Sequence, residues 1–233
     1  MRNTRHLVIT RDYPENTIGG IMVCGINFGY SKEDEALESQ GLELATEPLS
    51  FFSDETVNQT KFRKRILQWL RSWNLNLSGA PGMEGVLEKS FFQTNWFDNQ
   101  TRGVGTEGHF NAKAMVEGEI KQREQKIQDL GVLALVEARK PRAIIFFGAA
   151  LIEAFNDIRL RPTIEAALGP RSGNAQRMGL RVDTFKGRVF NVMYQRFGST
   201  SIVCLPHPQA HGITDEFIAS LSVPEEVMAN LRG

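Results

Sequence analysis

The chain has 233 residues, 41% of them apolar, which is enough to bury one large single-domain core or two small ones. Its 27 basic and 27 acidic residues give a formal net charge of zero, which argues against a protein that coats nucleic acid by charge alone. No apolar run approaches the roughly 18 residues of a membrane helix, and the N-terminus lacks the length of apolar chain that a signal peptide needs.

Short apolar, β-rich segments alternate with helical patterns along the chain. This alternation predicts a single α/β domain over residues 1–233, a three-layer α/β/α sandwich around a central, mainly parallel sheet. The expected strands are residues 6–10, 21–26, 90–94, 143–147, 189–193 and 201–205. The expected helices are residues 60–73, 116–140 with a possible break at Gly131, 149–156 and 214–221. Residues 60–73 predict an amphipathic helix whose outer face is basic.

The first candidate site residue is Asn27, which follows the apolar run 21–26 inside a turn bracketed by Gly25 and Gly29. In open α/β sheets, ligands bind at the carboxyl ends of such strands. The spacing is not that of a dinucleotide-binding fingerprint, and the turn has no phosphate-loop lysine, so we expect no nucleotide cofactor. An amide here can orient a water molecule, or it can serve only to form the turn.

The second candidate is His207, just after the apolar run 201–205. A histidine at a strand end can donate a hydrogen bond to a carbonyl oxygen on which negative charge develops, and Pro208 would hold the loop in shape. His211 lies four residues further on, but the intervening proline denies the two histidines a helical face. No cysteine or carboxylate stands at ligand spacing, so we expect no metal.

Amide and aromatic residues supply the remaining candidates. Asn95 ends the expected strand 90–94 and offers an acceptor and a donor to the edge of a base, or it is simply a strand end packed by aromatic rings. Phe51 and Phe52 precede the basic helix, where either ring could stack on a planar ligand or lie in the core.

Charge is distributed unevenly along the chain, because residues 139–212 hold 11 Lys and Arg against 4 Asp and Glu. This imbalance allows a basic face.

Taken in order, these residues resemble the uracil-DNA glycosylase superfamily over residues 20–220. The sequence Cys-Gly-Ile-Asn-Phe-Gly at residues 24–29 resembles the first motif of the mismatch-specific branch, Gly-Ile-Asn-Pro-Gly, and that of the single-strand-selective branch, Gly-Met-Asn-Pro-Gly. His207-Pro208 resembles the second motif, His-Pro-Ser. Asn95 resembles the asparagine that reads uracil, and Phe51 or Phe52 resembles the ring that stacks on the base.

The resemblance implies a monofunctional DNA glycosylase without a cofactor, acting on uracil or a similar damaged base in single-stranded or mispaired DNA. Asn27 and His207 would be catalytic, the first holding the attacking water and the second stabilising charge on the base. Phe28 would line the base pocket with Asn95. The expected DNA contacts are Gly25, Gly29, Ser31, Pro208 and His211.

The chain departs from this pattern at two places. Phe28 stands where the family has proline, and residues 209–212, Gln-Ala-His-Gly, replace the family's continuation of the second motif. Two other functions therefore stay open: a non-catalytic nucleic-acid-binding protein on the same fold, and a nucleotide or small-molecule hydrolase. We expect a soluble protein of the cytoplasm, or of the nucleus in a eukaryote, that does not bind membranes.

Overall fold

The structure is a computed structural model that describes residues 10–11, 13, 18–26, 28–29, 36, 39–40, 61–78, 82–96, 100–101, 117, 131–178, 183–184 and 188–233. For residues 10–11, 28–29, 61, 100–101, 183–184 and 188–189 it describes the backbone alone.

The centre of the molecule is a seven-stranded sheet in the order β1-β4-β2-β6-β11-β10-β7. Its strands, in chain order, are β1 (Thr10–Arg11), β2 (Ile21–Gly25), β4 (Phe91–Asn95), β6 (Ala143–Phe147), β7 (Gln176–Arg177), β10 (Met193–Phe197) and β11 (Thr200–Leu205). The four middle strands, β4, β2, β6 and β11, are parallel to one another. The edge strands β1 and β7, and β10 beside β7, pair antiparallel to their neighbours. The predicted α/β class with a mostly parallel central sheet is therefore confirmed.

The sequences of the parallel strands are continuous apolar runs, because both faces of the sheet are covered. Alternate residues enter two separate cores: Ile21 and Val23 belong to one, and Met22 and Cys24 belong to the other. Cys24 and Cys204 both pair with Phe146, from opposite sides. This register places the carboxyl ends of the parallel strands along one edge of the sheet.

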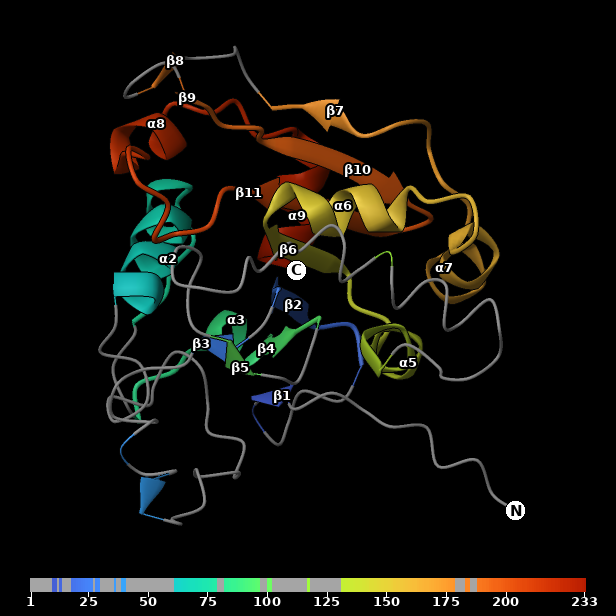
Figure 1. Ribbon diagram of the computed structural model, residues 1–233, viewed down its shortest axis with the longest axis horizontal. Helices are drawn as coiled ribbons and strands as arrows, with labels where there is room; N and C mark the ends of the chain where they lie inside the picture. The colour runs from blue at the N-terminus through green and yellow to red at the C-terminus, as the bar shows by residue number, and fades with distance from the viewer. Residues whose placement is uncertain are drawn as a thin grey trace.

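Helices cover both faces of the sheet, giving three layers (Figure 1). One core is closed by residues of α2 (Lys61–Ser72), α8 (Asp215–Ala219) and α9 (Glu225–Arg232), and α2 and α8 lie side by side. The other core is closed by residues of α5 (Gly131–Arg139), α6 (Ala149–Phe155) and α7 (Arg161–Leu168). The short helix α3 (Val86–Lys89) leads directly into β4.

Arg142 joins several chain segments at the amino ends of the parallel strands. Its Nε donates to the carbonyl of Asn230 at 2.9 Å, its Nη1 to the carbonyl of Gly19 at 2.8 Å, and its Nη2 to Ser90 Oγ at 3.0 Å. Partial burial lowers the pKa of Arg142. Because its donors serve the segments before β2 and β4 and the end of α9, this residue stabilises the edge opposite the strand carboxyl ends.

Two small two-stranded sheets lie outside the main one. The chain after β2 and the chain after β4 run parallel again as β3 (Phe28–Gly29) and β5 (Gln100–Thr101). A second pair, β8 (Asp183–Thr184) and β9 (Arg188–Val189), is antiparallel.

One of the expected strands is wrong in its bounds. The strand expected at 189–193 is in fact the end of β9, a connection, and the start of β10, because β10 has mixed polarity and gives no apolar signal. Of the expected helix 116–140, Glu117 is helical and α5 forms the part from Gly131 to Arg139, while residues 116 and 118–130 lie outside the described part of the chain. Helices α7 and α9 were not expected from the sequence. Of the helices the structure describes, none has the length and apolar character to cross a membrane.

Candidate nucleic-acid base site

The candidate site lies at the carboxyl edge of the parallel strands. From β2 the chain goes first to β4 on one side and then to β6 on the other, so the strand order reverses between β2 and β6. Such a switch point is where open α/β sheets bind their ligands. Gly25, Asn95 and Phe147 end three of the strands here, and His207 follows the fourth by two residues.

Asn95 is buried, with 4% of its surface exposed, although it ends its strand. It pairs with Gly25 in register, so both residues face the same side of the sheet. The backbone N–H of Trp96 donates to the carbonyl of Gly25 at 2.9 Å. The amide oxygen of Asn95 occupies the space that a side chain at position 25 would need. The missing Cβ of Gly25 therefore admits the Asn95 amide to the strand end.

Gly148 closes the switch point on the β6 side. Its φ of 129° is a backbone conformation that favours glycine, and a Cβ there would lie 3.1 Å from Ile26 Cδ1. Its N–H donates to the carbonyl of Leu205 at 3.0 Å. The ends of β2, β6 and β11 are thus packed together, and α6 begins directly at this edge.

His207 is held in a defined orientation by its own turn. The N–H of Ala210 donates to the His207 carbonyl at 2.8 Å, and the N–H of Gln209 donates to His207 Nδ1 at 3.2 Å. A ring nitrogen that accepts from a backbone N–H carries no hydrogen, so the neutral ring has its hydrogen on Nε2. Desolvation by neighbouring atoms lowers the pKa of His207, although part of the side chain is exposed. The ring is therefore a neutral donor through Nε2 at pH 7.

Aromatic rings support the histidine from the sheet side. The centroid of Phe62, on α2, lies 5.3 Å from that of His207 and 5.5 Å from that of Phe147. The Trp69 ring contacts Phe147 from the same helix, with centroids 6.3 Å apart. His207 therefore packs on an aromatic column that ends in the core.

The basic face expected for α2 is only partly present. Arg63 is buried, with 6% exposed, and Arg65 is turned toward the loop that follows β11. Lys64 is exposed. The sequence identified these residues as charges but not their partners, because the groups that Arg65 contacts lie 143 to 150 residues further along the chain.

Several expected site residues lie outside the described residues: Asn27, Ser31, Phe51 and Phe52. Of Phe28 and Gly29 only the backbone is described, and it forms β3 beside Gln100 and Thr101. Pro208 is buried and His211 is exposed. The structure therefore brings Gly25, Asn95, His207 and Pro208 to one edge of the sheet.

The two cysteines are buried and free. Burial raises the pKa of the Cys24 thiol, and it raises that of Cys204 to about 12. Neither thiol ionises near pH 7, so neither is a nucleophile here. Within the described part of the chain, no three His, Cys, Asp or Glu side chains gather as a metal site would require.

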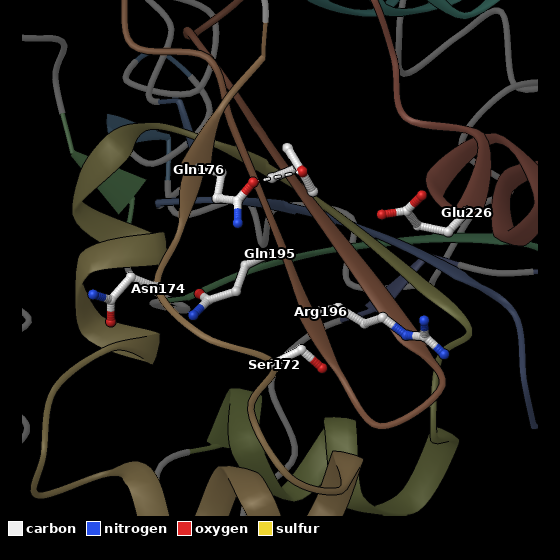
Figure 2. A pocket seen from close by; sticks show the side chains of 7 residues that line it. Ser172, Asn174, Gln176, Gln195, Arg196 and Glu226 are labelled. Atoms are coloured by element: carbon white, nitrogen blue, oxygen red, sulfur yellow. Dashed lines mark hydrogen bonds between the residues drawn. The ribbon is translucent and has the colours of Figure 1, made fainter.

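A separate pocket of about 180 Å³ lies beside the antiparallel strands β7 and β10, at one edge of the sheet (Figure 2). Its lining is polar and comes from β7, β10, α9 and the segment before β7: Ser172, Asn174, Gln176, Tyr194, Gln195, Arg196 and Glu226. Tyr194 donates to Gln176 Oε1 at 2.7 Å, and the buried Gln195 amide is bonded to Asn156 and Gly173. None of the lining residues comes from the strand ends around Asn95 and His207.

Comparison with the models of known protein families gave no match to this chain, and comparison with curated proteins gave none either.

Proposed function

We propose that this protein is a DNA glycosylase that hydrolyses the N-glycosidic bond of uracil or a similar damaged base, with its base site at the carboxyl edge of the parallel strands. The observation that carries the proposal is the state of His207. Its Nδ1 accepts from Gln209, so its Nε2–H is free to donate, and its lowered pKa keeps the ring neutral. Such a group suits a carbonyl oxygen on which negative charge develops.

Asn95 supports the same proposal from the other side of the switch point. Uracil presents a donor at N3 and an acceptor at O4, and an amide can meet both with its oxygen and its NH2 group. Asn95 is 4% exposed, so its amide has little access to water. A bound base that did not pair with this amide would therefore bind more weakly, by the full desolvation penalty of the group. A site of this kind selects between bases that differ in one hydrogen bond.

The reaction follows from these positions. The bond between sugar C1′ and base N1 breaks, and its electron pair leaves with the base, which gives an oxocarbenium-like sugar and a pyrimidine anion. His207 donates to the base O2 as its charge grows. Water then adds to C1′, and the proton that it loses to solvent is balanced by the one that the released pyrimidine anion takes up. The sequence pattern assigns the holding of that water to Asn27.

The enzyme must reach a base outside the helical stack, which is easier in DNA that is single-stranded or mispaired. Extruding a nucleotide from a duplex costs a few kcal/mol and is easiest where pairing is already weak. The chain has no net charge to drive tight, non-specific duplex binding. We therefore propose such DNA as the substrate.

The test incubates the protein with single- and double-stranded oligonucleotides that contain one uracil, then uses alkali to reveal abasic sites. Strands with thymine in place of uracil are the control. Base release from the uracil strands alone is expected, and His207→Ala should slow it by about 100-fold, the cost of one donor to developing charge. A folded protein that leaves every strand intact would exclude the uracil activity.

Binding measurements then separate the other two functions. Salt-dependent affinity for oligonucleotides without base release would indicate a non-catalytic DNA-binding protein. Affinity for free nucleotides alone would indicate a small-molecule enzyme that uses the same edge of the sheet.

A further inference from the structure

Arg65, on α2, contacts two points of the loop that carries His207. Its Nη1 donates to the carbonyl of Pro208 and its Nη2 to the carbonyl of Ile213, each at 2.5 Å. These two carbonyls are five residues apart, so one guanidinium spans the loop. The residue immediately before the first contact is His207.

Asp215 and Trp69 hold the guanidinium in place. Arg65 Nε lies 3.2 Å from Asp215 Oδ1, which also accepts from Trp69 Nε1 at 2.6 Å. The Arg65 Cζ atom lies 5.5 Å from the centroid of the Trp69 ring. Asp215 begins α8, whose preceding residue Thr214 accepts a capping bond from the Phe217 N–H at 3.2 Å. The two helices therefore fix the geometry of Arg65 from both sides.

We propose that Arg65 is a positioning residue for His207, an inference that rests on the proposed function. His207 is oriented by a turn whose next residue, Pro208, is the one that Arg65 holds. Phe62, three residues before Arg65 on the same helix, contacts the imidazole ring. Helix α2 thus sets the tilt of the ring through Phe62 and the place of the loop through Arg65.

Lysine cannot replace this arrangement. The guanidinium reaches two carbonyls and a carboxylate in three directions of one rigid plane, whereas an ammonium group is a single point on a flexible stem. Arg65→Lys should keep the positive charge but lose the simultaneous hydrogen bonds to the Pro208 and Ile213 carbonyls. Arg65 is also distinct from its neighbour Lys64, which is exposed and contributes the same charge, so Lys64→Ala serves as the matched control.

The first measurement is ¹⁵N NMR of His207 in the wild type, Arg65→Ala, Arg65→Lys and Lys64→Ala. The wild type and Lys64→Ala should show the hydrogen on Nε2. Both Arg65 variants should show a mixture of tautomers and a His207 pKa closer to the ordinary value of about 6.5. A general loss of stability would not change the tautomer in the folded protein. If Arg65→Ala does not fold, Arg65→Lys gives the same comparison.

The second measurement is single-turnover release of uracil from a single-stranded oligonucleotide. A displacement of about 1 Å at a reacting group can cost about 100-fold in rate, so we expect up to that loss in Arg65→Ala and a smaller one in Arg65→Lys. Affinity for the oligonucleotide should change little, and Lys64→Ala should react at the wild-type rate.

An Arg65→Ala protein with the wild-type tautomer and the wild-type rate would overturn the positioning role. If the wild type releases no base from any DNA, the proposed function fails while the NMR comparison remains decisive. In that case a changed tautomer still supports the hold of Arg65 on His207, and an unchanged one overturns it.

Discussion

The amide oxygen of Asn95 occupies the space that a methyl group on Gly25, its register partner on the neighbouring strand, would need. Gly25→Ala should therefore push the amide aside or part the two strands. We expect a loss of about 1–3 kcal/mol in the free energy of unfolding, measured in urea, because overpacking a buried site costs this much.

Gly85→Ala is the matched control for that variant. Gly85 has a φ of −77° and nothing within 4 Å of its missing Cβ, so alanine meets no clash there. Because Gly85 is the N-cap of α3, we expect a small loss of at most about 0.5 kcal/mol. Equal stabilities of the two variants would contradict the close fit at Gly25.

Acid should destabilise the fold through His207. Its pKa in the folded state is lowered, so below about pH 6.5 the unfolded chain binds a proton more readily than the folded one. Stability is therefore fully present above that pH and falls as the pH drops toward the folded pKa. His207→Gln should flatten this part of the stability curve in urea unfolding at several pH values. A curve equally steep in both proteins would show that other groups cause the slope.

Asn95→Asp should remove the hydrogen-bond donor of the base site. A carboxylate accepts but does not donate, so it cannot serve the O4 oxygen of uracil. We expect at least a 100-fold slower release of uracil, since a site built for a hydrogen bond strongly rejects the mismatch. Asn95→Gln, which keeps the amide, is the comparison variant. Uracil release from Asn95→Asp at the wild-type rate would remove Asn95 from base recognition.

Asn27→Ala tests the residue that the sequence places at the attacking water. Base release should be abolished, while the affinity for a uracil-containing strand, measured by fluorescence anisotropy, should stay nearly the same. Unchanged turnover would mean that another group holds the water.

Arg142→Ala should weaken the amino edge of the sheet without reaching the base site. Three acceptors, from Gly19, Ser90 and Asn230, would lose their partner, at a cost of about 2–3 kcal/mol in the free energy of unfolding. Below its melting transition the variant should release uracil at the wild-type rate. Arg232→Ala, at an exposed residue near the same edge, should leave the stability close to that of the wild type.

The elements that the sequence predicted well are those governed by burial. Apolar runs bounded by turn residues located β6 at its observed bounds and β2 and β11 to within one residue. Strand β10 was mislocated, because Tyr194, Gln195 and Arg196 give an antiparallel strand near the sheet edge no apolar signature. Helix α9 did leave a signal in Pro224 and the spacing of Val227, Met228 and Leu231, which the sequence interpretation missed.

The candidate site divides in the same way. Residues at or just after a strand end, such as Asn95 and His207, could be located from the strand itself. Arg65 could not, since nothing local distinguishes it from Lys64, and its partners are determined only by the packing of α2 against the loop after β11. The room that Gly25 leaves for Asn95 is likewise a property of two paired strands and not of either sequence alone.

The contacts of Arg65 also determine when the site can form during folding. Pro208, Ile213 and Asp215 follow Arg65 by 143 to 150 residues, so the loop cannot be anchored until β11 has joined the sheet and brought these partners to α2. Contacts of such long range close late, because the entropy of the intervening chain must first be lost. During synthesis, α2 is made long before the acceptors that Arg65 needs. We therefore expect the contacts of Arg65 with the histidine loop to form after α2 and β11 have already been made.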